Sequence, residues 1–324
     1  MSENHITTLC FGKLPAFADF VRHNAAGKEI QAFDQWIQEG VQLAKIRLHP
    51  NWELAYKRAP GYRFIFPFKE NNKSILAGLI QSSVDKIGRT YPFILAMLIN
   101  KAFLQLECYH IAPVLFKNFI EKAEVFMAEA SHEQVLQDIP EKVEALGSNF
   151  IQSMNDSINL YNNFKNKTSI SLLIKRMSIS LDGVFKIQLF ENIVKELISL
   201  LKYHTPPLNY GLRIPLGNDF QLSIFEATFW IELLGKLFSQ NFNVPYLFHT
   251  SSGSNKRLYL YLFFNYPSPK SFVNLIQVDL EIDSIYKLDG PDLLKNKHNE
   301  NIASRGCCNI FDIEQSLNDF LKNF

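Results

Sequence analysis

The sequence predicts an α/β fold in which helices cover both faces of a mixed sheet, with a second α/β region towards the C-terminus. Apolar runs typical of strands alternate along the chain with segments of helical periodicity. Residues 93–99 form an apolar run without polar alternation, which is typical of a strand buried on both faces. Hydrophobic residues make up 47% of the 324 residues and charged residues 20%, so the chain has ample material for a core.

The first hundred residues predict strands over 7–11, 62–66, 75–80 and 93–99. A turn at 71–73 joins the second and third of these strands, which we expect to pair as a hairpin. Apolar residues at three- and four-residue spacing predict a helix over 28–48. Asn51 is expected to cap a shorter helix over 52–57 by accepting a backbone N–H.

The rest of the chain alternates between the two kinds of element. Helices are predicted over 113–130 and 141–161, with Ser131 capping the segment between them. The polar stretch 162–168 favours a boundary between an N-terminal domain, residues 1–160, and a C-terminal α/β region, residues 165–324. In that region we expect strands over 169–176, 210–215, 244–248, 257–264 and 277–282. We expect helices over 189–201 and 225–238, a short helix that starts at residue 269, and a last helix that Asp312 caps and that ends at about residue 321.

Composition narrows the class of protein. The 33 basic and 32 acidic residues give a net charge of +1, which argues against general nucleic-acid binding. Cys10, Cys108, Cys307 and Cys308 form no Cys-x-x-Cys pair, so we expect free thiols in a reducing compartment. No signal peptide is visible and no apolar run approaches about 18 residues. We therefore expect a cytoplasmic protein without membrane insertion.

Motifs of known enzyme classes are missing from the sequence. There is no nucleophile elbow, no phosphate-binding glycine loop and no zinc-binding His-Glu-x-x-His. The eight histidines are scattered and never fall at helical ligand spacing. We therefore expect no enzymatic activity, no metal and no cofactor.

The segment 82–92 is the most informative part of the chain, because it connects two apolar strands yet carries Asp85, Gly88, Arg89 and Pro92. Gly88 can adopt a positive φ at little steric cost. Asp85 and Arg89 either pair with each other and stabilise only their own loop, or face a partner together. An exposed pair of this kind is worth only about 0–1 kcal/mol.

A second polar stretch, residues 11–22, sets Lys13, Asp19 and Arg22 among aromatic residues. It is either a solvated loop or a recognition surface with fixed charges beside apolar anchors. Both polar stretches adjoin strands, so we expect them to converge at one edge of the sheet. The candidate partner-binding residues are therefore Lys13, Asp19, Arg22, Asp85 and Arg89.

Four ordered blocks of this sequence resemble the TagF family, accessory proteins of bacterial type VI secretion systems. They are residues 11–15 with 19–22, residues 33–36 with 52–56, residues 60–64 and, most specifically, residues 83–92. Tyr62 stands where the family more usually has tryptophan. Ala18 stands before Asp19 where the family usually has glycine, and an alanine argues against a positive φ at that position. Beyond about residue 110 the likeness fades.

The resemblance implies a three-layer α/β/α sandwich and a non-enzymatic role in post-translational control, usually restraint, of secretion-system assembly. It also implies a link to the forkhead-associated (FHA) scaffold protein and to a threonine kinase/phosphatase pathway. One hypothesis is a binding protein that holds a secretion component through the five candidate residues. An alternative is a small-molecule or nucleotide-binding regulator in which Arg89 and Lys13 hold an anion. A purely structural role for Asp85 and Arg89 also stays open.

Overall fold

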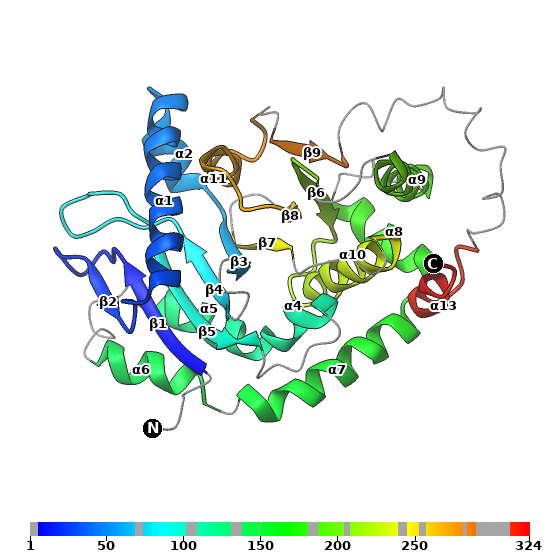
Figure 1. Cartoon of the computed structure of the whole chain (residues 1–324), viewed down its shortest axis with the longest axis horizontal. Coiled ribbons are helices and arrows are strands. Elements are labelled where there is room, and N and C mark those ends of the chain that lie inside the picture. Colours follow the sequence, from blue (N-terminus) through cyan, green and yellow to red (C-terminus); the bar gives the residue numbers. More distant parts are fainter. Residues whose placement is uncertain are drawn as a thin grey trace.

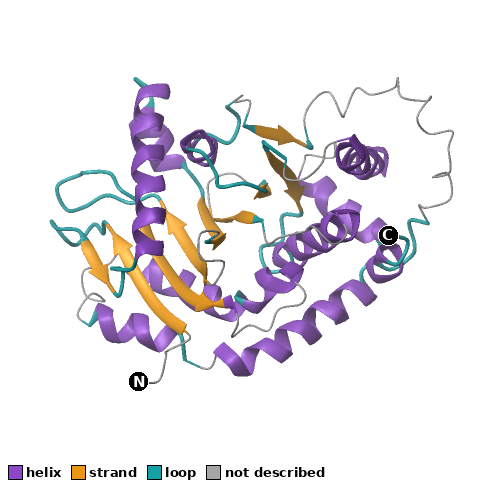
Figure 2. Ribbon diagram, viewed as in Figure 1, coloured by secondary structure: helices purple, strands orange, loops and turns teal. Residues whose placement is uncertain are grey.

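One mixed sheet runs through a computed structural model of the chain, shown in Figures 1 and 2. The structure describes residues 6–68, 74–101, 109–130, 138–148, 150–180, 187–203, 208–238, 245–252, 257–280, 284–289 and 312–324. Adjacent strands are antiparallel, apart from a parallel pair at one edge. Across the described sheet the order is β2 (Val21–His23), β1 (Ile6–Gly12), β5 (Phe93–Asn100), β4 (Ser74–Gln81), β3 (Gly61–Pro67), β7 (Tyr246–Ser252), β8 (Leu258–Phe263), β6 (Gly211–Leu216) and the parallel β9 (Ile285–Lys287).

Helices cover both faces of this sheet, as the sequence predicts, and enclose two separate apolar cores. One face carries α1 (Lys28–Arg47), α2 (Trp52–Arg58) and α11 (Pro269–Ile276). The other face carries η1 (Tyr109–Ile111), α4 (Ala112–Leu115), α5 (Lys117–Glu129), α6 (Ile139–Leu146), α7 (Phe150–Lys167), α8 (Ile170–Ser180), α9 (Ile187–Tyr203), α10 (Ser223–Phe238) and α13 (Leu317–Leu321). The fold is therefore a three-layer α/β/α arrangement.

The central strand β3 shows how the sequence builds these layers. Tyr62, Phe64 and Phe66 enter the core beneath α1 and α11, while Ile65 between them enters the opposite core. This alternation follows from the two-residue period of a strand. β3 and β4 pair as an antiparallel hairpin, which confirms that prediction.

Helices α1 and α11 come from distant parts of the chain and lie against each other (Figure 1). A Cβ atom on Gly40 of α1 would lie 2.5 Å from the Phe272 side chain of α11, so this crossing requires the glycine. The Trp36 indole donates a hydrogen bond to the Ser268 carbonyl at 3.3 Å, just before α11. The N-terminal and C-terminal regions therefore share one layer of the fold.

Two predicted strands are wrong. Residues 170–176 of the first lie in helix α8, because Ile170, Leu173, Ile174 and Met177 recur at helical spacing and face the core. No strand occurs over the described residues 277–280, and β9 instead lies at Ile285–Lys287.

Several helix boundaries also differ from the predictions. The helix predicted over 113–130 is divided at Phe116 into α4 and α5, and the one over 141–161 becomes α6 and α7. Asn51 precedes α2 without a side-chain capping bond. Ser316, rather than Asp312, caps the last helix by accepting the Asp319 N–H at 3.1 Å. Most of the polar stretch 162–168 is the end of α7.

Strands from both sides of residues 162–168 pair in the same sheet, since β3 pairs with β7. The C-terminal α/β region therefore extends the N-terminal sheet, and the division of the chain into two domains stays a prediction. The turn at 71–73, the Ser131 cap and three of the cysteines, Cys108, Cys307 and Cys308, lie outside the described residues. Cys10 is a free, buried thiol whose pKa burial raises to about 12.

Candidate docking surface

Asp85 is the centre of the loop that follows β4, and its side chain is 0% exposed. One carboxylate oxygen, Oδ2, accepts hydrogen bonds from Lys13 Nζ at 2.8 Å and from Arg89 Nε at 2.6 Å. The other, Oδ1, accepts the backbone N–H groups of Ile87 at 3.1 Å and Arg89 at 2.8 Å. Four hydrogen bonds therefore fix this carboxylate, three from its own loop and one from Lys13 in the loop after β1.

The loop closes on itself around this carboxylate. The Asp85 N–H donates to the Arg89 carbonyl at 3.1 Å, and the Gly88 N–H donates to the Asp85 carbonyl at 2.9 Å. Gly88 has a φ of +86°, so the positive φ expected from the sequence is confirmed. A backbone bridge between Val84 and Thr90 completes a narrow, ordered turn.

Positive charge exceeds negative charge at this turn, because Asp85 faces both Lys13 and Arg89. Burial on its own would raise the pKa of Asp85, but the hydrogen bonds from Lys13 and Arg89 outweigh it and hold that pKa well below its usual value. Asp85 is therefore ionised at neutral pH. Its single negative charge faces two cations, so a net positive charge stays on the half-exposed Arg89 side chain.

The two polar stretches converge, as expected, at the edge of the sheet formed by β1 and β2. Arg89 Nη2 donates to the carbonyl of Ala18, and the Lys86 N–H donates to the carbonyl of Phe17 at 2.9 Å. Ala18 does not have a positive φ, so the loop accommodates alanine where the resemblance implies glycine. Gly12 is needed here, because it has a φ of +128° and an added Cβ would lie 2.1 Å from the Pro92 carbonyl oxygen.

A second network fixes Arg22 beside this turn. Arg22 Nη2 lies 3.2 Å from the buried Asp34 carboxylate, which also accepts a hydrogen bond from the Tyr91 hydroxyl. Burial and the neighbouring Asp34 both raise the pKa of Tyr91 far above its usual value. The Arg22 guanidinium also lies 5.5 Å from the Phe20 ring centre, and that ring meets Tyr91 edge-on. Asp34 thus ties α1 to both loops.

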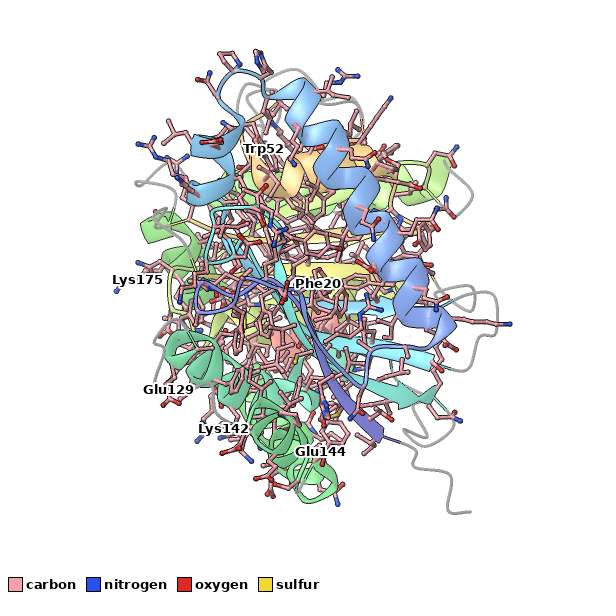
Figure 3. The ribbon with its side chains drawn as sticks, turned by 90° about the vertical axis from the view of Figure 1, so that its left-hand side faces the viewer. Phe20, Trp52, Glu129, Lys142, Glu144 and Lys175 are labelled. Carbon is pink, nitrogen blue, oxygen red and sulfur yellow. The ribbon has the colours of Figure 1, made fainter. Side chains whose placement is uncertain are left out.

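Two apolar side chains project from these fixed loops. Ile87 at the tip of the turn is 66% exposed and Phe20 is 39% exposed. Asp19 is exposed beside them and makes no ion pair or side-chain hydrogen bond among the residues that the structure describes. Figure 3 looks onto this face, with Phe20 near its middle between Trp52 of α2 and Glu129 of α5. We define the docking surface as Asp19, Phe20, Arg22, Ile87 and Arg89.

The five residues singled out from the sequence therefore fall into two groups. Lys13 and Asp85 lie between the two loops, where their side chains are 14% and 0% exposed. Asp19, Arg22 and Arg89 reach the surface. Contact of any of the five with a partner stays a prediction. Phe20 and Ile87 were not among the candidates. Their only sequence signal is an apolar side chain inside a charged loop.

Asp34 and Tyr91 were also missed as parts of the site. Asp34 interrupts the apolar stripe of α1 and is buried, and that interruption is the signal that marks it. Within the described residues, no cluster of three potential metal ligands occurs. Nor does any described helix combine the length and apolarity that a membrane span needs.

The fold and the site together define a three-layer α/β protein with two rigid, interlocked loops at one edge of its sheet. Residues 10–146 match the family described as TagF N-terminal domain, type VI secretion system-associated. Residues 10–146 are therefore a TagF N-terminal domain, a type VI secretion system-associated domain, which confirms the resemblance seen in the sequence. The matched region contains both loops of the docking surface.

Among solved structures, the crystal structure of PA0076 from Pseudomonas aeruginosa PAO1 is similar to part of the chain. The match has a TM-score of 0.35 and 18% sequence identity, and it covers 44% of this chain. It spans 62% of that protein, which is less than two thirds of its length. No curated protein matches the sequence.

Proposed function

We propose that this type VI secretion system-associated protein is a cytoplasmic, non-enzymatic accessory protein that restrains secretion-system assembly or activation after translation. It acts by binding a scaffold component, and the FHA-domain protein is the first candidate. The family match supports the association with the secretion system. The buried Asp85 carboxylate accepts three hydrogen bonds from its own loop and one from Lys13 of the other loop, and this is the observation that carries the binding role.

A rigid surface of this kind suits protein recognition. Ordering a flexible loop on binding costs free energy, and a loop held in place beforehand avoids that cost. Aromatic residues and arginine are the side chains most enriched at energetic centres of interfaces, and Phe20, Arg22 and Arg89 supply them here. Ile87 adds an aliphatic side chain at the tip of the turn.

Burial assigns different roles to the candidate residues in this proposal. Asp85 and Lys13 position the loops, because their charged groups are turned towards each other at 2.8 Å and away from solvent. Asp19, Arg22 and Arg89 contact the partner together with Phe20 and Ile87. Loss of Asp85 then weakens binding through loop geometry, whereas loss of Ile87 weakens it directly.

The alternative of a nucleotide or another anion held by Lys13 and Arg89 has less support. Both cations already bond the Asp85 carboxylate, so an anion has to compete with a buried, ionised group. A thermal-shift screen with nucleotides tests this alternative. A ligand that binds only the folded state raises the melting temperature, and we expect no such shift.

The binding role is tested with the purified full-length chain and the purified FHA-domain protein of the same secretion system. Ile87→Asp places a charge on the docking surface and should weaken binding at least tenfold in calorimetry. Ile46→Asp is the matched control, because Ile46 of α1 is 75% exposed and lies outside the docking surface. Equal affinity of wild type and Ile87→Asp would remove this surface from the interface.

The restraining role needs a separate measurement in the bacterium that encodes the protein. Deleting the gene should raise type VI secretion, measured as effector released into the medium. The wild-type gene and Ile46→Asp should restore low secretion, while Ile87→Asp should not. A fall in secretion on deletion would show that the protein promotes the system instead.

A further inference from the structure

A small open pocket lies beside residues 82–84, the stem that leads from β4 into the Asp85 turn. Neither the family match nor the docking surface assigns a role to this pocket. It has a volume of about 240 Å³. Its walls come from the loop after β1, the end of α2, the end of β4 with the following stem, the start of β5 and α5. The residues that line this side pocket are Leu14, Pro15, Tyr56, Lys57, Gln81, Ser82, Ser83, Val84, Phe93 and Met127.

The volume of the side pocket indicates which kinds of ligand fit inside it. Sites for drug-sized molecules and cofactors typically have volumes of about 300–1,000 Å³. A cavity of about 150 Å³ is enough to hold one benzene ring. At 240 Å³ the side pocket is below the usual range of such sites and is large enough for one aromatic or aliphatic side chain.

The chemistry of the walls is apolar with a positive rim. Leu14, Val84, Phe93 and Met127 supply apolar surface, and none of the ten lining residues carries a carboxylate. Lys57 is exposed, and its ammonium group makes no ion pair or hydrogen bond with any residue that the structure describes. A ligand that places an apolar group in this pocket therefore gains most from a negative charge beside that group, where it can pair with Lys57.

The polar wall is already committed to the protein itself. The Tyr56 hydroxyl donates to the Ser83 carbonyl and accepts the Ser83 N–H, both at 3.2 Å. This pair of bonds ties α2 to the stem of the Asp85 turn, so the pocket has a fixed shape. Because the same stem carries Asp85 and Ile87, an occupant of the pocket also lies next to the docking surface.

We propose that the side pocket receives one apolar side chain, preferably aromatic, from a partner segment that carries an acidic residue next to it. This proposal rests on the proposed function, because it names the chemistry of the partner at the same face. The apolar side chain replaces water against Leu14, Val84 and Met127, and the adjacent carboxylate pairs with Lys57. A partner segment with this pattern then continues onto Phe20 and Ile87.

The test needs no identified partner. The full-length chain is labelled at the methionine methyl groups, and Met127 is assigned from a Met127→Leu variant. The blocked tetrapeptide glycine–phenylalanine–aspartate–glycine is titrated as the probe, with the phenylalanine replaced by glycine, or the aspartate by lysine, in two control peptides. We expect the acidic phenylalanine peptide to shift the Met127 methyl signal saturably, with a Kd on the order of 1 mM for so small a ligand.

Two variants separate pocket binding from general contact. Ser82→Phe fills the pocket and should abolish the shift, while Ser148→Phe adds the same ring at an exposed position outside it. Lys57→Glu should weaken the acidic peptide at least threefold and improve the lysine peptide, which keeps the test valid should Ser82→Phe not fold. The buried Met97 and Met177 methyl groups serve as internal references.

Three outcomes would overturn the proposal: no saturable shift at 10 mM peptide (about ten times the expected Kd), equal binding of all three peptides, or a shift of Met127 by ADP alone. The last result would assign the side pocket to a nucleotide instead of a partner side chain. Peptide binding together with a failed interaction with the FHA-domain protein would leave the pocket intact and reject only the identity of the partner.

Discussion

Lys13 and Asp85 stand 72 positions apart in the sequence, yet their charged groups meet at 2.8 Å. The sheet explains this contact. Strand β1 pairs antiparallel with β5, and Phe11 near the end of β1 lies opposite Ile94 near the start of β5. The loop that leaves β1 and the loop that enters β5 are therefore neighbours, and the ion pair joins them.

Asp85→Asn should lower the melting midpoint by several degrees. The amide has nearly the same shape but removes the negative charge from the side of Lys13 and Arg89, which leaves a largely buried lysine without its counter-ion. Asp19→Asn is the matched control, because the exposed Asp19 side chain makes no ion pair among the described residues, and it should change stability by no more than about 0.5 kcal/mol. Equal melting midpoints for the two variants would contradict the positioning role of Asp85.

Acid should reduce the contribution of the Asp85 ion pairs to the free energy of unfolding. The pKa of Asp85 is lower in the folded protein than the ordinary value of 3.8, so the unfolded chain binds more protons in acid. The stabilisation is complete above about pH 5, and it declines as the pH falls below the ordinary pKa towards that of the folded state. Urea unfolding of wild type and Asp85→Asn should show a stability difference at pH 6 that shrinks towards pH 3. A difference independent of pH would contradict an ionised Asp85.

Gly12→Ala should destabilise the protein more than Gly88→Ala. Both glycines have a positive φ, but a Cβ on Gly12 would meet the Pro92 carbonyl oxygen at 2.1 Å, while one on Gly88 would meet nothing within 4 Å. We expect a loss of at least about 2 kcal/mol at Gly12 and about 1 kcal/mol at Gly88. Denaturant unfolding measures both, and the opposite order would show that the two loops do not touch at Gly12.

Stability should also depend on Glu226 near neutral pH. Glu226 lies in the first turn of α10, fully buried, where it accepts the Gly217 N–H at 2.7 Å. Burial raises the pKa of Glu226 to about 7, despite that hydrogen bond and Arg176 at 3.9 Å.

Because the pKa of Glu226 is higher in the folded state, its stabilising contribution is complete below about pH 4.5 and is lost as the pH rises through 7. Wild type should lose up to about 3 kcal/mol over this range relative to Glu226→Gln. Glu141→Gln, at an exposed position on α6, should keep the wild-type pH profile. Parallel profiles for wild type and Glu226→Gln would show that Glu226 does not titrate in this range.

Local sequence signals were sufficient for much of the fold and for the centre of the site. The apolar runs gave β1, β3, β4 and β5, and the periodicity of residues 28–48 gave α1. Glycine between Asp85 and Arg89 indicated a tight turn, and the structure confirms it with a positive φ. These features depend only on neighbouring residues, which is why a sequence can reveal them.

Features that depend on distant residues were harder to predict. Residues 170–177 are apolar enough for either a strand or a helix, and their packing on the core decides for the helix. The sequence allows Asp85 to pair with Arg89, four positions away, and the structure shows this pair, but it does not indicate that Lys13 bonds the same oxygen. Exposure of Phe20 and Ile87 follows from how two loops interlock, and no single segment encodes that arrangement.

The shared sheet has a consequence for how the protein can be divided. A fragment ending at residue 160 would lose β7 and α11, so β3 would present a bare flank of unpaired backbone groups, and Tyr62 would lose the Leu275 carbonyl to which it now donates at 2.8 Å. An unpaired strand edge of this kind is a template for pairing with a second copy of the fragment. A hybrid protein that keeps the loops of Lys13 and Asp85 in their present setting should therefore include the strands from both halves of the sheet.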